Sequence, residues 1–230
     1  MRTAGTTRRF LPDPVPDAVL HRVLDNARFA PNGGNRQGWH VIVVTDPATR
    51  RSLHDLYQPP WQAYLTERYG LAAGTPPGPD VPLALRRTME FAERLYEIPV
   101  HLLVTVDLRA LAVTDRNLPR QSIVGGGSVY PFIHNLLLGL RQEGLGAALT
   151  TLIIPAEPAV KKLLAIPPEH ALAALIAIGH PADPLPTKLR RMSVEEFRWG
   201  TPSLPTKLNK TKIQAWRVGL APPGPVGSVI

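Results

Sequence analysis

The 230-residue sequence contains no cysteine. This excludes disulfide bonds, thiolate metal ligands and cysteine nucleophiles, and it is compatible with a cytoplasmic location. Long apolar runs are also missing: those at residues 98–106 and 171–178 are far shorter than the roughly 20 residues that cross a bilayer. The first ten residues lack the apolar stretch of a secretion signal. We therefore expect a cytoplasmic protein with no membrane partner.

Familiar catalytic motifs are missing as well. Gly144-Leu145-Gly146 resembles the start of a dinucleotide fingerprint, but Leu149 stands where the third glycine is required. Gly125-Gly126-Gly127-Ser128 resembles a nucleophile elbow, but Tyr130 replaces the closing glycine. The seven histidines include no pair four residues apart, so we expect no metal site. The sequence predicts no catalytic side chain, and an enzyme here would need a cofactor that carries the chemistry.

Acidic residues are scarce near the end of the chain. The net charge is +8, and from residue 184 onward eight lysines and arginines stand against two glutamates. These basic residues do not form a helical stripe with interleaved aromatics, the pattern typical of nucleic-acid binding. We expect no nucleic-acid partner, since a small phosphorylated ligand would use such charges equally well.

Apolar residues at helical spacing and short β-branched runs define the expected elements. Asp46 is the expected cap of one helix, and Ser193 with Glu196 has the capping-box spacing that starts another. The proline-rich residues 59–82 are the least regular part, and loops this long are usually functional or disordered. Helices are expected over residues 17–30, 46–57, 83–96, 128–144 and 156–164, and strands over residues 40–45, 99–108, 147–154 and 171–178.

Little material for a core remains after Gly200, where prolines are frequent. We expect one domain over residues 1–200 and an extended C-terminal arm over residues 201–230, which needs another surface to lie on. The helix at residues 132–140 is apolar enough to take part in an interface between subunits.

Three separated polar segments point to a ligand when they are taken together. They are Arg8-Arg9-Phe10, the stretch from Ala30 to Trp39 (APNGGNRQGW), and Gly179-His180-Pro181 leading to Lys188 and Arg190. Each has a simpler interpretation as a solvated arm, a turn or a solvated loop. Together they supply guanidinium and ammonium groups for a phosphate, and glycine backbone and amide groups for a polar ring.

The order and spacing of these segments resemble the nitroreductase superfamily of FMN enzymes, from about residue 2 to residue 199. The second segment matches the family pattern A-P-S-G-G-N-x-Q-P-W at seven positions, with Asn32 and Gly38 as departures. A further departure is Ala4-Gly5, where the family usually places an arginine that Arg2 would have to replace. The resemblance implies an α+β fold, with a mostly antiparallel sheet of four or five strands sandwiched by helices, and an intertwined homodimer.

The resemblance also implies roles for individual residues. The partner subunit would contribute the second segment, and the flavin ring would lie along the strand that follows Gly146. The implied FMN-binding residues are Thr6, Arg8, Arg9, Pro31, Asn32, Gly33, Asn35, Gln37, Thr150, Thr151, Leu152, Lys188 and Arg190.

The function implied by the resemblance is ping-pong hydride transfer, in which NAD(P)H reduces FMN and an electron-poor acceptor such as a nitroaromatic or a quinone reoxidises it. The alternatives are an FMN-dependent oxidase or dehydrogenase of a biosynthetic intermediate, a reductive dehalogenase, and a non-catalytic flavin-binding protein. The aromatic residues Trp61, Tyr64, Tyr69 and Phe91 form a candidate substrate wall, and an equally weighted interpretation makes them core under a loop.

Overall fold

The computed structural model describes residues 1–198 apart from 77 and 80. Met1–Thr187 form one compact unit, and the residues from Lys188 onward belong to a second unit. A single sheet with strand order β1-β2-β4-β3 is antiparallel throughout, which confirms the expected fold class. Its strands are β1 (Trp39–Val44), β2 (Val100–Asp107), β3 (Gly146–Thr150) and β4 (His170–Gly179).

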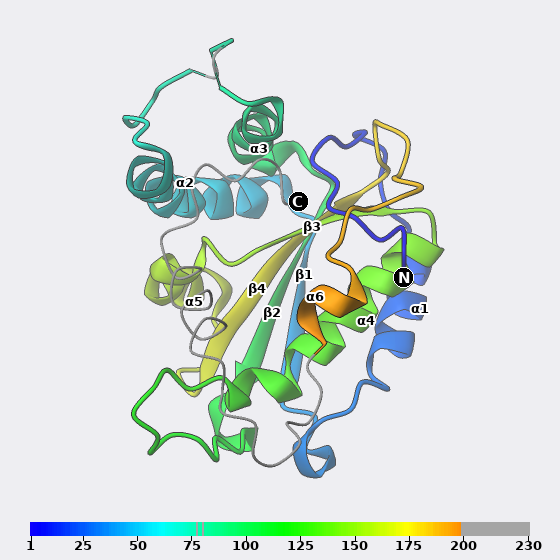
Figure 1. Cartoon of the computed structure of the whole chain (residues 1–230), viewed down its shortest axis with the longest axis vertical. Helices are drawn as coiled ribbons and strands as arrows, with labels where there is room; N and C mark the ends of the chain where they lie inside the picture. Colours follow the sequence, from blue (N-terminus) through cyan, green and yellow to red (C-terminus); the bar gives the residue numbers. More distant parts are fainter. Residues whose placement is uncertain (77, 80, 199–230) are drawn as a thin grey trace. The chain divides into compact units, whose positions relative to one another are not determined.

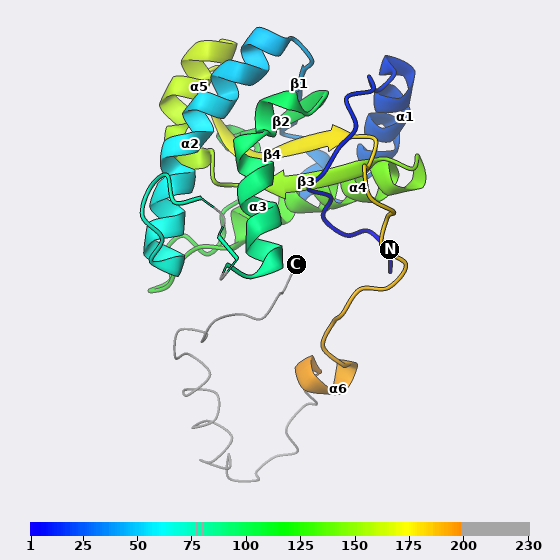
Figure 2. The ribbon, with the colours of Figure 1, turned by 90° about the horizontal axis from the view of Figure 1, so that it is seen from above.

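Helices cover both faces of this sheet (Figure 1). On one face lie α1 (Asp17–Ala27) and α4 (Tyr130–Gln142). On the other lie α2 (Pro47–Tyr69), α3 (Leu83–Glu93) and α5 (Glu157–Leu164), which Figure 2 shows from above. Short 3₁₀ turns join these elements: η1 (Gly33–Asn35), η2 (Leu95–Glu97), η3 (Leu108–Ala110), η4 (Val124–Ser128) and η5 (Ile154–Ala156). No described helix is both long and apolar enough to span a bilayer.

The two central strands supply both cores because neighbouring side chains on a strand point to opposite faces. Leu102 and Val104 of β2 belong to the core that α1 and α4 cover. Leu103 belongs to the core that α2, α3 and α5 cover. Both β2 and β4 are buried on both faces, as the uninterrupted apolar run at residues 171–178 predicts.

Helices α1 and α4 pack closely at Gly139. A Cβ at this position would lie 3.3 Å from Val23 Cγ1, which is tight for carbon atoms. The glycine therefore allows the two helices to approach each other over the first core.

Helix α2 is longer than the sequence predicts. The expected end near Tyr57 is wrong, because the helix continues through Pro59 and Pro60 to Tyr69 and ends at Gly70 in the left-handed conformation. The physical reason is an apolar stripe with a spacing of four residues, formed by the buried side chains Leu53, Tyr57, Trp61 and Leu65. The free energy gained by burying this stripe exceeds the cost of the two backbone N–H donors that Pro59 and Pro60 lack. The expected Asp46 cap is confirmed, since its carboxylate accepts from the Thr49 amide at 2.7 Å.

Helix α4 uses its apolar face within the protomer. Phe132, Ile133, Leu136 and Leu140 are buried in the first core, and the Phe132 ring stacks on Trp39 with centroids 4.8 Å apart. The apolar side chains that suggested an interface at this helix are therefore buried within the protomer, and an interface through its other residues stays a prediction.

The described residues after Thr187 contain one short helix, α6 (Val194–Phe197). Its predicted capping box is confirmed, since the Ser193 amide donates to Glu196 Oε2 at 2.6 Å. The predicted arm at residues 201–230 lies outside the described residues.

Candidate active site

The N-terminal segment that contains Arg8 is fixed to the sheet by backbone hydrogen bonds. The Thr7 amide donates to the Ala147 carbonyl of β3 at 2.9 Å, and the Leu11 amide donates to the His180 carbonyl at 2.8 Å. Gly146 makes this approach possible, because a Cβ there would lie 2.6 Å from Thr7 Cγ2. Arg8 lies between these two hydrogen bonds, so the sheet fixes the position of its backbone.

Arg8 is half-buried among groups that carry no negative charge. Burial lowers the pKa of its guanidinium, the nearby phenol of Tyr57 opposes this shift, and the charge of Arg87 on α3 adds to it. Over residues 1–198, leaving aside 77 and 80, no carboxylate lies within ion-pair distance of Arg8. Its positive charge is therefore available to an anionic or polar ligand.

Tyr57 links the surroundings of Arg8 to the end of β3. Its hydroxyl lies 3.4 Å from Thr150 Oγ1, and the Leu152 amide donates to the same Thr150 oxygen at 3.2 Å. Burial raises the pKa of Tyr57 to about 12, so the phenol stays protonated and remains a donor at neutral pH. The structure thus brings the predicted residues Arg8, Thr150 and Leu152 to one place. It adds Tyr57, whose position in the apolar stripe of α2 gave no sign of this polar contact.

Three other predicted residues lie beside this group in the chain. Thr6, Arg9 and Thr151 are exposed. Arg9 pairs with Asp183 at 3.2 Å, with both side chains about half exposed. A pair this exposed contributes little free energy, so a phosphate can compete with Asp183 for Arg9.

The second predicted segment forms a tight polar loop. The Gln37 amide donates to Asn32 Oδ1 at 3.0 Å, and the Gln37 side-chain amide donates to Asn35 Oδ1 at 3.2 Å. Asn35 and Gln37 both have positive φ, at 51° and 49°, and Gly34 between Gly33 and Asn35 has a φ of 62°. Non-glycine residues with this left-handed backbone are uncommon and cluster at ligand-binding sites, as expected for a loop that contacts a ligand.

Ser128 anchors the same loop and was missed by the sequence analysis. Its hydroxyl accepts from the Gly33 amide at 3.0 Å, across 95 residues of sequence. The Gly125-Gly126-Gly127-Ser128 run resembles a nucleophile elbow in sequence, and nothing in that pattern predicts this anchoring contact. Pro31 precedes the loop and is exposed.

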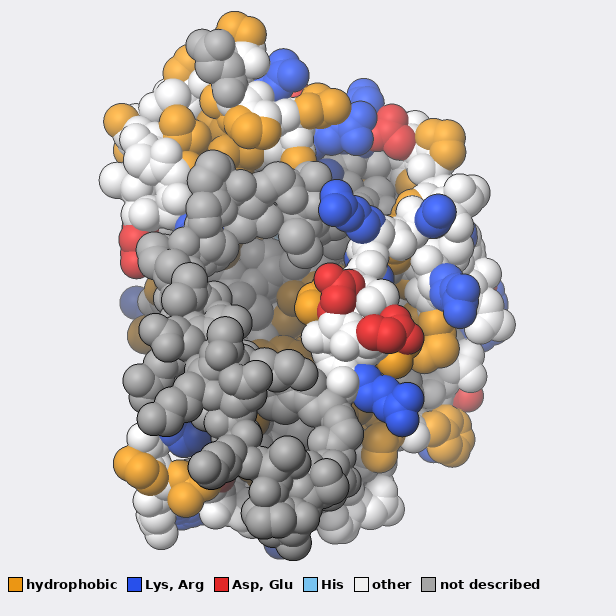
Figure 3. All heavy atoms as spheres, in the orientation of Figure 1, with side chains coloured by type: hydrophobic (Ala, Val, Ile, Leu, Met, Phe, Trp, Pro, Cys, Tyr) orange, Lys and Arg blue, Asp and Glu red, His pale blue; other side chains and the backbone are white. Residues whose placement is uncertain are grey.

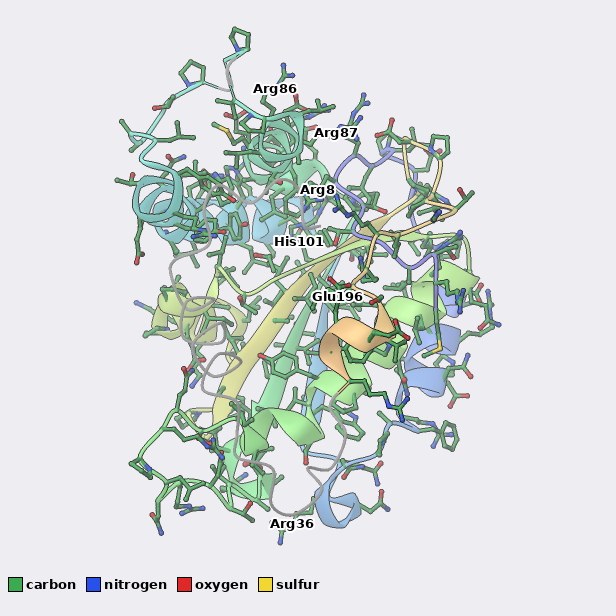
Figure 4. The ribbon with its side chains drawn as sticks, viewed as in Figure 1. Arg8, Arg36, Arg86, Arg87, His101 and Glu196 are labelled. Atoms are coloured by element: carbon green, nitrogen blue, oxygen red, sulfur yellow. The ribbon has the colours of Figure 1, made fainter. Side chains whose placement is uncertain are left out.

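The two predicted groups of cofactor residues do not meet within one protomer. Figure 4 shows Arg8 in the upper half of the view and Arg36, from the middle of the Asn32–Gln37 loop, at the lower end, so the two lie far apart. Thr150 and Leu152 accompany Arg8 through Tyr57. Pro31, Asn32, Gly33, Asn35 and Gln37 therefore form a separate half-site. Lys188 and Arg190 belong to the separate unit that begins at Lys188, so their place relative to the two half-sites stays a prediction.

The four candidate substrate aromatics divide into two kinds. Trp61 and Phe91 are 2% and 5% exposed and belong to the second core. The interpretation as core residues is therefore correct for these two, since so little of either side chain is open to a surface ligand. Tyr64 is half-buried and Tyr69 is exposed. Successive rings in the series Trp61, Tyr64 and Tyr69 have centroids 5.9 Å apart, so the row leads from the core to the surface.

The residues present fit a phosphorylated flavin by their chemistry. Around Arg8 they offer an uncompensated guanidinium and two hydroxyl groups, which suit a polar ring edge or a phosphate. The Asn32–Gln37 loop offers exposed amide groups. Neither half-site contains an acid and a base positioned for proton transfer, in keeping with a site in which a cofactor carries the reaction.

Comparison with known proteins extends this picture. A family model described as "Nitroreductase family" matches residues 2–180. A protein named NADH dehydrogenase from Thermus thermophilus is 30% identical over 183 residues, which cover 76% of this chain and 82% of that protein. A nitrobenzene nitroreductase from Ectopseudomonas oleovorans is 24% identical over 225 residues, covering 86% and 93% of the two chains.

A solved structure shares the fold. The crystal structure of oxidised iodotyrosine deiodinase bound to FMN and 3-iodo-L-tyrosine superposes with a TM-score of 0.61 and 23% identity, covering 86% of this chain and 96% of that one. At this identity the likeness shows the fold alone. The family model, which spans most of the chain, and the Thermus relative establish that this protein belongs to the nitroreductase family of oxidoreductases.

Proposed function

We propose that this protein is an FMN-dependent oxidoreductase that transfers a hydride from NAD(P)H to an electron-poor acceptor, such as a nitroaromatic or a quinone, in a ping-pong sequence. The observation that carries the proposal is the half-buried Arg8, held by the sheet beside Tyr57 and Thr150 with no described carboxylate to offset its charge. When bound, FMN supplies the redox chemistry by accepting a hydride from the nicotinamide and giving it to the acceptor.

The protein's own residues would bind and orient the cofactor. Arg8 would hold a fixed positive charge against the polar edge of the ring, where it favours added negative charge. Thr150, Thr151 and Leu152 would lie along the ring. Thr6 and Arg9, with Lys188 and Arg190, would hold the phosphate. No side chain is proposed as an acid or a base.

The proposed site is shared between two protomers. Its support is the separation of the half-sites, since Arg8 and Arg36 of the Asn32–Gln37 loop lie far apart in one protomer (Figure 4). In a homodimer with a two-fold axis, the Asn32–Gln37 loop of one protomer would meet the Arg8 group of its partner, and the reverse.

The relatives add support for the type of reaction. One is named as an NADH dehydrogenase and another as a nitrobenzene nitroreductase. The solved deiodinase holds FMN in the same fold. These names favour reduction of an electron-poor aromatic compound through FMN, and NADH or NADPH as the electron source.

The test is an absorbance spectrum of the purified protein after incubation with FMN and gel filtration, recorded before and after anaerobic addition of NADH or NADPH. We expect the flavin bands to remain with the protein and to bleach on addition of the nicotinamide. Addition of nitrobenzene or a quinone is then expected to restore them.

The other outcomes separate the alternatives. Flavin bands that stay with the protein but resist both nicotinamides would favour the oxidase or dehydrogenase reaction. Failure to retain FMN would contradict the proposed cofactor. An Arg8→Ala variant that retains FMN as tightly as the wild type would contradict the assigned role of Arg8.

A further inference from the structure

Helix α3 carries two adjacent arginines, Arg86 and Arg87, near the Arg8 half-site. Arg87 is exposed, and its charge lies close enough to Arg8 to lower the pKa of that guanidinium. Arg86 is half-buried, and its Nε is closed off from solvent without a hydrogen-bond partner among the described residues. Figure 4 shows all three arginines at the same end of the protein, and Figure 3 shows blue side chains gathered over this region.

These positive charges are not neutralised by ion pairs among the described residues. In the part of the chain that the structure describes, neither Arg86 nor Arg87 forms an ion pair, whereas Arg94 at the end of the same helix pairs with Glu97 at 2.7 Å. Two guanidiniums close together repel each other, and an anion between them removes that repulsion. A carboxylate or a phosphate also matches the planar donor geometry of arginine.

The proposed FMN site already accounts for the charge of Arg8, but not for that of Arg87. Arg8 lies on the segment assigned to FMN, whereas α3 lies outside every segment assigned to it. Arg87 is also the more exposed of the pair, as suits a group that contacts a ligand which arrives and leaves in each cycle.

We propose that Arg87, next to Arg8 and supported by Arg86, binds an anionic group of a reactant that exchanges at the flavin site. The group is a carboxylate on the acceptor or the 2′-phosphate of NADPH, and both present the same chemistry to the guanidinium. The inference rests on the proposed function, because it names the class of reactant that the same site prefers.

The kinetic test compares the FMN-loaded wild type with Arg87→Gln in two ratios of kcat/KM. The first ratio is that of 4-nitrobenzoate to the neutral 4-nitrobenzamide, with NADH as donor. The second is that of NADPH to NADH, with 4-nitrobenzamide as acceptor. We expect one ratio to fall about tenfold or more, as for loss of a charge-assisted hydrogen bond. A fall in the first ratio assigns the anion to the acceptor, and a fall in the second assigns it to NADPH.

Two further variants control for charge and geometry. Arg87→Lys keeps the charge but not the planar donors, and we expect it to retain more of the preference than Arg87→Gln. Lys162→Gln removes an exposed charge from α5, away from the site, and is expected to leave both ratios unchanged. If Lys162→Gln lowers a ratio as much as Arg87→Gln does, net charge explains the effect and the proposal fails.

A binding measurement tests the same inference without turnover. Calorimetry with the oxidised FMN-loaded protein compares benzoate with benzamide, and NADP⁺ with NAD⁺. Arg87→Gln is expected to lose the preference for the anionic member of one pair. If both preferences and both kinetic ratios are unchanged, the proposal is overturned. It is also overturned if Arg87→Gln lowers only the preference of the apoprotein for FMN over riboflavin, since Arg87 would then serve the cofactor phosphate.

Failure of this inference differs from failure of the proposed function. Wild-type protein that is reduced by NADH and reoxidised by 4-nitrobenzamide has the proposed function, whatever Arg87 does. Protein that prefers the anionic probes in calorimetry through Arg87, but is not reduced, has the anion site without the proposed reaction.

Discussion

His101 on β2 illustrates how burial changes the chemistry of one side chain. It is completely buried, and its Nε2–H donates to the Leu95 carbonyl at 2.9 Å. Burial lowers the pKa of His101 to about 4, and the nearby charges of Arg50 and His54 add to the shift. The imidazole is therefore neutral in the folded protein over most of the acidic range.

This shift predicts a loss of stability in acid. Between the ordinary pKa of 6.5 and about 4, the unfolded chain binds a proton at His101 and the folded chain does not, so acid favours unfolding. We expect His101 to lower the free energy of unfolding by up to about 3 kcal/mol as the pH falls across this window. Urea unfolding at a series of pH values measures the effect.

Two histidine variants isolate that contribution from the acid sensitivity of the carboxylates. His101→Gln keeps a donor for Leu95 and is expected to flatten the dependence on pH between about 6.5 and 4. His134→Gln removes an exposed histidine on α4 and is expected to leave the dependence as in the wild type. Equal slopes for the two variants would contradict the assignment to His101.

At the scale of the element, α2 contains prolines in two different settings. Pro47 opens the helix, where a missing donor costs nothing. Pro59 lies inside the helix, where the ring crowds the preceding turn and a backbone donor is lost. Both are exposed, so their side chains contribute little packing.

Replacement of these prolines by alanine is expected to have opposite consequences. Pro59→Ala should raise the free energy of unfolding by about 1–3 kcal/mol, since the helix regains a donor at a small cost in unfolded-chain entropy. Pro47→Ala should be neutral or slightly destabilising. Thermal or urea unfolding measures the free energy of unfolding of the two variants. A Pro59→Ala variant no more stable than Pro47→Ala would show that Pro59 does not destabilise the helix.

The same helix shows how far the sequence predicts the elements. The strands were predicted to within a few residues, because short apolar runs in a sheet covered on both faces have few alternative arrangements. Helix α2 was predicted twelve residues too short, because proline is a local signal and the burial of Trp61 and Leu65 is a tertiary effect.

The sequence predicted several residues of the site, but not the contacts that bring them together. The family pattern named Arg8, Thr150 and the Asn32–Gln37 loop. The hydrogen bonds of Tyr57 and Ser128 with these residues, and the charge of Arg87 near Arg8, join positions far apart in the chain. Such contacts follow from how α2, α3 and η4 pack on the sheet, which no local pattern encodes.

At the scale of the whole molecule, the two half-sites lie far apart in the protomer (Figure 4). If each flavin site combines the halves of two protomers, defects in different halves should complement each other. Arg8→Ala disables one half, and Asn35→Gly disables the other while keeping the left-handed backbone that Asn35 adopts. Each variant alone is expected to be nearly inactive.

A mixture of the two variants, refolded together, should recover about a quarter of the wild-type activity, because half of the dimers are mixed and each of these has one intact site. Arg8→Ala mixed with Thr150→Ala is the matched control and should recover nothing, since both changes lie in the same half. Mixed dimers without recovered activity, or a protein that is monomeric in sedimentation, would contradict the shared site.

The hydrogen bond from Thr7 to Ala147 has a consequence for solubility. Strand β3 is an edge strand with a small, apolar sequence, and an uncovered edge of this kind invites pairing with another molecule. The segment that positions Arg8 also occupies part of this edge. Deletion of the first eleven residues would therefore remove a proposed flavin contact and open a route to aggregation in the same step. Such a truncation should appear first as insoluble protein, and only then as lost activity.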